Sequence, residues 1–157
     1  MPATMALAVS MAAFVVGFDG GAALALANDG RATARQASRV YLTENAQLRL
    51  TNEGEATLNE RGEAKGTFNA PVTSQLNLSP SHVTAVFTVY PKGGSISGKA
   101  QARFVVRNSI GYYGGTLTII RGTGSYRRAS GSSLGISGTI NRLSFALTIK
   151  VNGWMSL

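Results

Sequence analysis

The sequence predicts an all-β protein that folds as an antiparallel eight-stranded β-barrel, with a β-sandwich as the alternative. No segment after residue 40 has a sustained helical period. Several segments there are rich in Val, Ile, Thr and aromatic residues, which favour strands. Turn sequences separate them at short intervals, as is typical of sandwiches and barrels. We favour the barrel because closure leaves no strand edge unpaired.

Alternating apolar residues indicate strands with one face in a core. Segment 46–51 places Leu48 and Leu50 on one face. Segments 82–90 and 115–121 have the composition of strands. The longest alternation covers 142–151, where one face would carry Leu143, Phe145, Leu147, Ile149 and Val151.

Segment 95–104 carries small residues on the face that follows Ile96, namely Gly98, Ala100 and Ala102. Small inward side chains ease the curvature of a barrel or leave room for a ligand. Glycine, proline and polar residues then mark the expected turns. These turns are expected at 53–56, 61–64, 79–82, 90–94, 108–115 and 121–124.

The N-terminal segment predicts export. Residues 6–18 form an apolar run of the length of a secretory signal, and Ala25 and Ala27 fit the small-residue rule before a cleavage site. We expect a signal peptide over 1–27, a flexible basic linker over 28–39 and a β-barrel domain over 40–157. A retained N-terminal helix or anchor is the alternative. The chain has no cysteine, which favours a bacterial secreted, periplasmic or envelope protein stabilised by its core alone.

The charge is strongly one-sided. The chain carries 15 Lys and Arg against 7 Asp and Glu, and no carboxylate side chain follows Glu63. Such asymmetry creates a positive potential that attracts anionic partners. For an exported protein these are anionic lipids, acidic glycans or small anions, and nucleic acid is not expected. The alternative is a basic protein with no dedicated anion.

Several catalytic classes are excluded by the residues present. His82 is the only histidine, which argues against a Ser-His-Asp triad and against a zinc site, and it is expected at a surface or strand end. A pair of carboxylates for glycoside hydrolysis is conceivable among Glu53, Glu55, Glu60 and Glu63, but we expect these on turns and outward faces. The spacing of a calcium loop is absent. No metal and no cofactor is expected.

The segment "RGTGSYRRASGS" at 121–132 is not a phosphate loop, because it has the wrong glycine spacing and no lysine. It resembles a motif of the allene oxide cyclase and dirigent barrel superfamily, including uncharacterised bacterial members, over about residues 110–153. The matching residues are Gly122, Thr123, Gly124, Tyr126, Ala129 and Gly131. The resemblance implies a turn that closes a barrel, an apolar pocket with few polar groups, and self-association.

Two groups of residues are candidates for binding. The barrel mouth is expected to carry Tyr112, Tyr113, Arg121 and Tyr126, with the two adjacent tyrosines in a loop. An anion-binding patch is expected from Lys99, Arg103, Arg107, Arg127 and Arg128.

Three functions follow from these candidates. The first is binding of an apolar or amphipathic small molecule in the barrel. The second is a cyclase or isomerase that works in an apolar barrel pocket, with Glu44 and Asn45 as the first candidates for an inward polar group. The third is an envelope-associated protein that binds anionic surfaces through its basic face.

Overall fold

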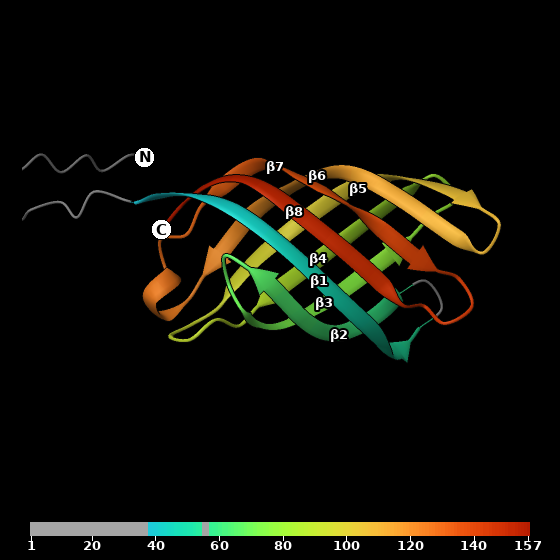
Figure 1. Ribbon diagram of the computed structural model, residues 1–157, viewed down its shortest axis with the longest axis horizontal. Helices are drawn as coiled ribbons and strands as arrows, with labels where there is room; N and C mark the ends of the chain where they lie inside the picture. Colours follow the sequence, from blue (N-terminus) through green and yellow to red (C-terminus); the bar gives the residue numbers. More distant parts are fainter. Residues whose placement is uncertain (1–37, 55–56) are drawn as a thin grey trace, which may run out of the picture. The chain divides into compact units, whose positions relative to one another are not determined.

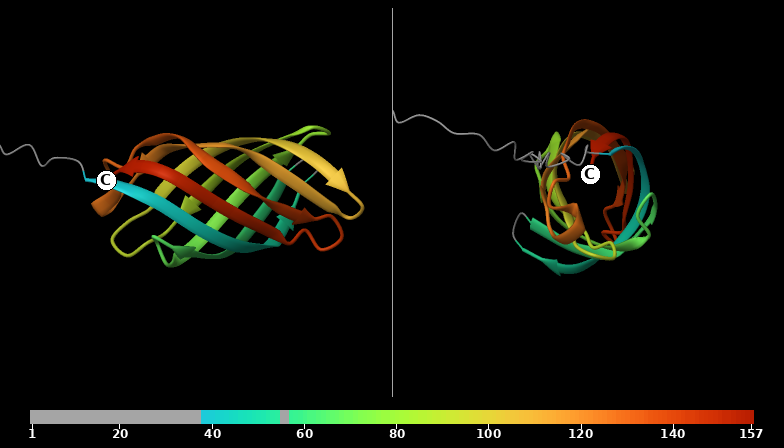
Figure 2. Two further views of the ribbon diagram at one scale, coloured as in Figure 1. Left: turned by 45° about the horizontal axis from the view of Figure 1, so that its top comes forward. Right: turned by 90° about the vertical axis from the view of Figure 1, so that its left-hand side faces the viewer.

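The computed structural model describes residues 38–54 and 57–157. These residues form a closed antiparallel barrel in which each strand pairs with its neighbours in sequence and β8 pairs with β1 (Figures 1 and 2). The eight-stranded barrel is therefore confirmed and the sandwich alternative is wrong. The strands are β1 Arg39–Glu53, β2 Thr57–Gly66, β3 Ala70–Leu78, β4 His82–Val89, β5 Ile96–Arg107, β6 Ile110–Gly122, β7 Gly131–Asn141 and β8 Leu147–Ser156, and a 3-10 helix η1 covers Gly124–Tyr126.

The predicted signal peptide and almost all of the predicted linker lie outside the described residues. Arg39, placed at the end of that linker, is already the first residue of β1. The described residues contain no helix with the length and hydropathy needed to cross a bilayer.

Alternation along each strand produces the core. On β5, Ile96, Gly98, Ala100 and Ala102 face inward as predicted, while the polar residues between them face solvent. Each leucine or isoleucine buried in this way contributes about 1.5–3 kcal/mol from removal of apolar surface from water. The largest apolar side chains that are fully buried are Leu48, Leu76, Leu134, Ile140, Leu147 and Met155.

The two ends of the barrel have different connections. At one end, called here the η1 end, lie the β2–β3 turn, the β4–β5 loop and the β6–β7 connection with η1. At the other, called the hairpin end, lie the β1–β2, β3–β4, β5–β6 and β7–β8 turns. In Figure 1 the η1 end is on the left, where the C-terminus also lies.

The segment that resembles the superfamily motif makes the β6–β7 reversal at the η1 end. Gly124 has a φ of +57°, which an L side chain rarely adopts. A Cβ on Gly122 would lie 1.7 Å from the carbonyl oxygen of Tyr126, so the chain can fold back only with glycine there. The Tyr126 ring packs edge-to-face on Phe68 in the β2–β3 turn, with centroids 5.6 Å apart.

The predicted strand over 142–151 is wrong in its first half. Residues 142–146 form the β7–β8 turn, in which Phe145 has a positive φ of 52°. The Asn141 Oδ1 atom accepts hydrogen bonds from the backbone N–H groups of Leu143 and Ser144, which stops the ladder there. Leu143 consequently points to solvent and is 81% exposed.

Of the predicted turns, the one at 61–64 is wrong and the one at 108–115 is correct only in its first two residues. Gly62, in the expected turn at 61–64, lies inside β2, where a Cβ would come within 1.8 Å of the carbonyl oxygen of Gln47 on β1. Glycine is needed there for close strand approach and not for a turn. In the expected turn at 108–115, only Asn108 and Ser109 form the turn, and β6 begins at Ile110.

Candidate ligand pocket

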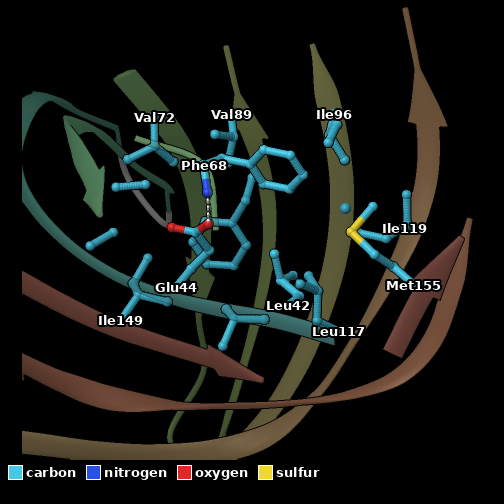
Figure 3. Close-up of a pocket in the computed structure, with 15 residues that line it drawn as sticks. Leu42, Glu44, Phe68, Val72, Val89, Ile96, Leu117, Ile119, Ile149 and Met155 are labelled. Carbon is cyan, nitrogen blue, oxygen red and sulfur yellow. Dashed lines mark hydrogen bonds between the residues drawn. The ribbon is translucent and has the colours of Figure 1, made fainter. Parts of the chain in front are cut away.

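A cavity of about 60 Å³ lies inside the barrel toward the η1 end (Figure 3). All strands except β7, together with the β2–β3 turn, contribute to its wall. Every lining residue except one is apolar, counting glycine, which has no side chain. The lining residues are Leu42, Glu44, Ala46, Ala64, Phe68, Val72, Phe87, Val89, Ile96, Gly98, Leu117, Ile119, Ile149, Val151 and Met155.

Glu44 is the one polar residue in this wall. Its side chain is only 6% exposed because its position on β1 faces inward, between the inward positions of Leu42 and Ala46. The Oε1 atom accepts a hydrogen bond from the backbone N–H of Phe68, while Oε2 is buried with no hydrogen-bond partner. Burial raises the pKa of the Glu44 carboxyl, and the Phe68 hydrogen bond opposes that shift. Asn45, the other sequence candidate, faces solvent.

A second carboxyl group is buried in the barrel, on β2. Glu60 is 2% exposed, and its Oε2 accepts a hydrogen bond of 3.2 Å from the Ser74 hydroxyl. Its Oε1 has no hydrogen-bond partner. Burial raises the pKa of Glu60 to about 7, with the Ser74 hydrogen bond acting against the shift. Glu60 is not part of the cavity wall.

Tyr113 completes this buried polar group. Its hydroxyl donates a 2.6 Å hydrogen bond to the carbonyl oxygen of Thr148 on β8. Burial, and then the negative charge of Glu60, raise the pKa of Tyr113 above its ordinary value. Ser74 and Tyr113 therefore place two hydroxyl groups inside the barrel together with the Glu60 carboxyl. These three residues were not grouped in the sequence analysis.

The expectation that the glutamates between 53 and 63 lie on turns and outward faces is wrong for Glu60. Glu53 and Glu63 are exposed as expected, and Glu55 lies outside the described residues. The signal that could have found Glu60 is parity, because it is two residues after the buried Leu58 and four before the buried Ala64.

The four residues expected at one barrel mouth do not come together. Tyr112 and Tyr113 are strand residues near the hairpin end, with Tyr112 facing solvent and Tyr113 facing inward. Arg121 and Tyr126 lie at the η1 end, Arg121 exposed and Tyr126 half-buried. None of the four lines the cavity.

The expected anion-binding patch divides in the same way. Lys99, Arg103 and Arg107 form an exposed stripe along β5, as the sequence predicts. Arg127 and Arg128 follow η1, beyond the opposite end of the adjacent strand. His82 is exposed as the first residue of β4, and its Nδ1 is 2.7 Å from the Ser81 hydroxyl.

Within residues 38–54 and 57–157, no group of three or more potential side-chain ligands is placed to hold a metal ion. No protein-family model matches the chain, and no curated protein or solved structure matches it either. The resemblance of residues 110–153 to the allene oxide cyclase and dirigent superfamily therefore stays a prediction.

Proposed function

We propose that this chain is an exported β-barrel that binds a small apolar or amphipathic molecule inside its η1 end. The observation that carries the proposal is the apolar cavity that contains one buried, half-satisfied carboxyl group, that of Glu44. Small-molecule sites are typically apolar with a few polar groups that orient the ligand. The pocket implied by the superfamily resemblance has the same character.

The chemistry of the wall restricts the ligand. A buried oxygen without a hydrogen-bond partner costs about 1–3 kcal/mol, and a ligand hydroxyl or amine that donates to Glu44 Oε2 removes that cost. A ligand carboxylate has no proton to donate and repels an ionised Glu44. The preferred ligand therefore has an apolar chain and a donor group.

The volume restricts the ligand further. The cavity of about 60 Å³ is smaller than the roughly 150 Å³ that accommodates benzene in an engineered protein interior. An unbranched alkyl chain fits this space better than a ring. A ligand larger than benzene, such as one with an octyl chain, requires Phe68 or Met155, both in the wall, to change rotamer.

Calorimetric titration with octanol, octylamine and octanoate tests the proposal. We expect octanol and octylamine to bind and octanoate to bind much more weakly. The variant Ala64→Leu, which fills the cavity, should abolish binding, whereas the matched control Thr118→Leu on the outer face of β6 should leave it unchanged. Absence of binding by all three compounds, or equal binding by both variants, contradicts the proposal.

The buried acid also favours a second candidate, a cyclase or isomerase in the same pocket. An uncharged carboxyl group in an apolar site can donate a proton or a hydrogen bond to a reacting oxygen. Turnover that survives in the Glu44→Gln variant excludes this role for Glu44. Ligand binding without any chemical change of the bound molecule supports the binding function alone.

Export is tested by the mass of the protein recovered from the medium or cell envelope. A chain that begins near Asn28, after cleavage beyond Ala27, supports the signal peptide. A chain that keeps residues 1–27 contradicts it. Recovery under native conditions also shows whether a small molecule travels with the barrel and whether the barrel self-associates.

A further inference from the structure

The hairpin end of the barrel presents apolar side chains directly to solvent. Leu143 in the β7–β8 turn is 81% exposed, the largest exposure among the big apolar side chains of the described residues. On the adjoining β5–β6 hairpin, Val105, Val106 and Tyr112 are 56%, 39% and 47% exposed. Val105 and Tyr112 are register partners and lie side by side on the outer face.

The two turns that carry these residues are fixed to each other. The backbone N–H of Arg142 donates a 2.8 Å hydrogen bond to the carbonyl oxygen of Ser109 in the β5–β6 turn. Phe145 packs against the core, and the hydrogen bonds from Leu143 and Ser144 to Asn141 hold the turn. Leu143 is thus held outward by its own turn. Figure 1 shows both turns at the right-hand end of the barrel.

Three arginines surround the apolar residues. Arg103 and Arg107 are exposed on β5 on either side of Val105, and Arg142 precedes Leu143. No carboxylate side chain follows Glu63 in the sequence, so β3 to β8 and their turns contain none to offset this charge. We call Arg103, Val105, Val106, Arg107, Tyr112, Arg142 and Leu143 the tip surface.

A hollow lies beside the tip surface at the same end. Its volume is about 370 Å³, and Arg142 is the only charged residue in its wall. The other lining residues are apolar except for one serine: Leu78, Ser79, Pro80, Phe104, Val106, Ile140 and Phe145. An apolar hollow with a guanidinium group at its border suits an acyl chain that carries an anionic head group.

We propose that the tip surface docks this protein on an anionic lipid bilayer. The aliphatic side chains enter the boundary between head groups and acyl chains, the tyrosine lies at that level, and the arginines bind the anionic head groups. This inference goes beyond small-molecule binding, because it uses the end of the barrel opposite the Glu44 cavity. The η1 end, toward which the ligand cavity lies, faces solution when the tip surface is docked.

Two other partners fit the tip surface less well. A second copy of the chain joined through the same patch would bring arginines against arginines across the two-fold axis, and β5 to β8, which carry the patch, contain no carboxylate side chain to pair with them. A nucleic acid accounts for the arginines, but not for an aliphatic side chain as exposed as Leu143. A bilayer accounts for both features.

The test is co-sedimentation of the full chain with phosphatidylcholine vesicles, prepared with and without phosphatidylglycerol. Wild type should bind only the anionic vesicles, and added salt should weaken that binding. The triple variant Arg103→Gln, Arg107→Gln, Arg142→Gln should lose about a hundredfold in affinity, since each basic residue near the surface contributes about 1 kcal/mol. Leu143→Ser should lose about tenfold through lost apolar burial alone.

Matched controls separate the tip surface from general charge and hydropathy. The triple control Lys92→Gln, Arg121→Gln, Arg127→Gln removes the same charge at the η1 end, and Ile120→Ser removes an exposed apolar side chain near that end. Both should bind nearly as wild type does. All these variants share residues 1–37, so differences among them come from the barrel.

Three results overturn the proposal: no binding of wild type to anionic vesicles, equal loss in the tip and control triple variants, or no loss in Leu143→Ser. Binding of an oligonucleotide with no effect of Leu143→Ser assigns the surface to nucleic acid and also overturns it. Circular dichroism of each variant establishes that the barrel is folded. Octanol titration of the same samples reports separately on the pocket, so failure of one proposal is distinguishable from failure of the other.

Discussion

Replacing Glu60 with glutamine should remove a pH dependence from the stability of the barrel. Glu60 is buried on β2, and only one of its carboxyl oxygens has a hydrogen-bond partner, the Ser74 hydroxyl. Burial favours the protonated form and raises the pKa to about 7. Glutamine has nearly the same shape and can keep the hydrogen bond to Ser74, but it never becomes charged.

The magnitude follows from the difference between the folded and unfolded pKa values. The Glu60 pKa rises from 4.5 to about 7, and each unit corresponds to about 1.4 kcal/mol, so its ionisation costs the folded state about 3 kcal/mol. Below pH 4.5 the Glu60 carboxyl is protonated in both the folded and the unfolded state, so its burial costs no free energy of ionisation. The contribution of Glu60 to the free energy of unfolding then decreases as the pH rises from 4.5 to about 7, and it stays constant above that. Glu60→Gln should therefore be about as stable as wild type at low pH and about 3 kcal/mol more stable at pH 8.

Urea unfolding followed by tryptophan fluorescence between pH 4 and pH 8 measures this difference directly. In thermal melts the same free energy corresponds to a gain of roughly 10 °C for the variant at pH 8. Glu63→Gln is the matched control, because Glu63 lies on the same strand and is exposed. Its stability relative to wild type should not change with pH.

A constant difference between Glu60→Gln and wild type across this pH range would refute the reasoning. It would mean that water or a neighbouring group stabilises the ionised carboxylate in the folded barrel. The raised pKa of Glu44 acts in the same direction in both proteins, and it therefore cancels in the comparison.

Two further predictions concern the packing of the barrel. Gly62→Ala should destabilise the barrel by about 1–3 kcal/mol in urea unfolding, because the new Cβ would lie 1.8 Å from the carbonyl oxygen of Gln47. The control Gly114→Ala places a Cβ with no atom within 4 Å and should be neutral or slightly stabilising. Equal effects at the two positions would contradict the argument that Gly62 allows close strand approach. Tyr113→Phe should lower the free energy of unfolding by about 1 kcal/mol through loss of the hydrogen bond to Thr148, and an unchanged urea midpoint would show that this bond contributes nothing.

The alternation of apolar and polar residues was sufficient to predict a strand where the strands paired with it also alternate. On β5 the small inward residues and the outward basic residues were both predicted, because a strand paired on both sides keeps strict parity over its length. The same rule failed at Leu143, where the side chain of Asn141 binds the backbone and ends the ladder. Apolar parity alone cannot reveal such a side-chain hydrogen bond.

The candidate site was predicted in part. Glu44 was selected as an inward acid, and the structure places it in the cavity wall. The mouth residues were grouped because they are close in sequence, yet Tyr113 lies near the start of β6 and Tyr126 lies in η1, beyond the other end of that strand. That strand has 13 residues, and at about 3.3 Å each it extends about 40 Å. Proximity along a long strand is not proximity in space.

The cavity itself depends on pairings between distant parts of the sequence. Its wall joins Leu42 and Glu44 to Ile149, Val151 and Met155, which meet only because β1 pairs with β8. No local pattern specifies that pairing. The sequence therefore predicts the inward face of each strand, but not which inward residues share a layer.

The order of the strands gives the barrel a cyclic connectivity. In the described part of the chain, the β1–β8 ladder alone joins strands that are not consecutive, and it places Arg39 opposite Ser156. The first and last strands are therefore as close as the strands of any hairpin, and a short peptide can link them. A circular permutant that starts at Ser109 and ends at Asn108 would keep all eight ladders and move the open junction to the β5–β6 turn. The architecture thus specifies a ring of hairpins in which the position of the chain ends is interchangeable.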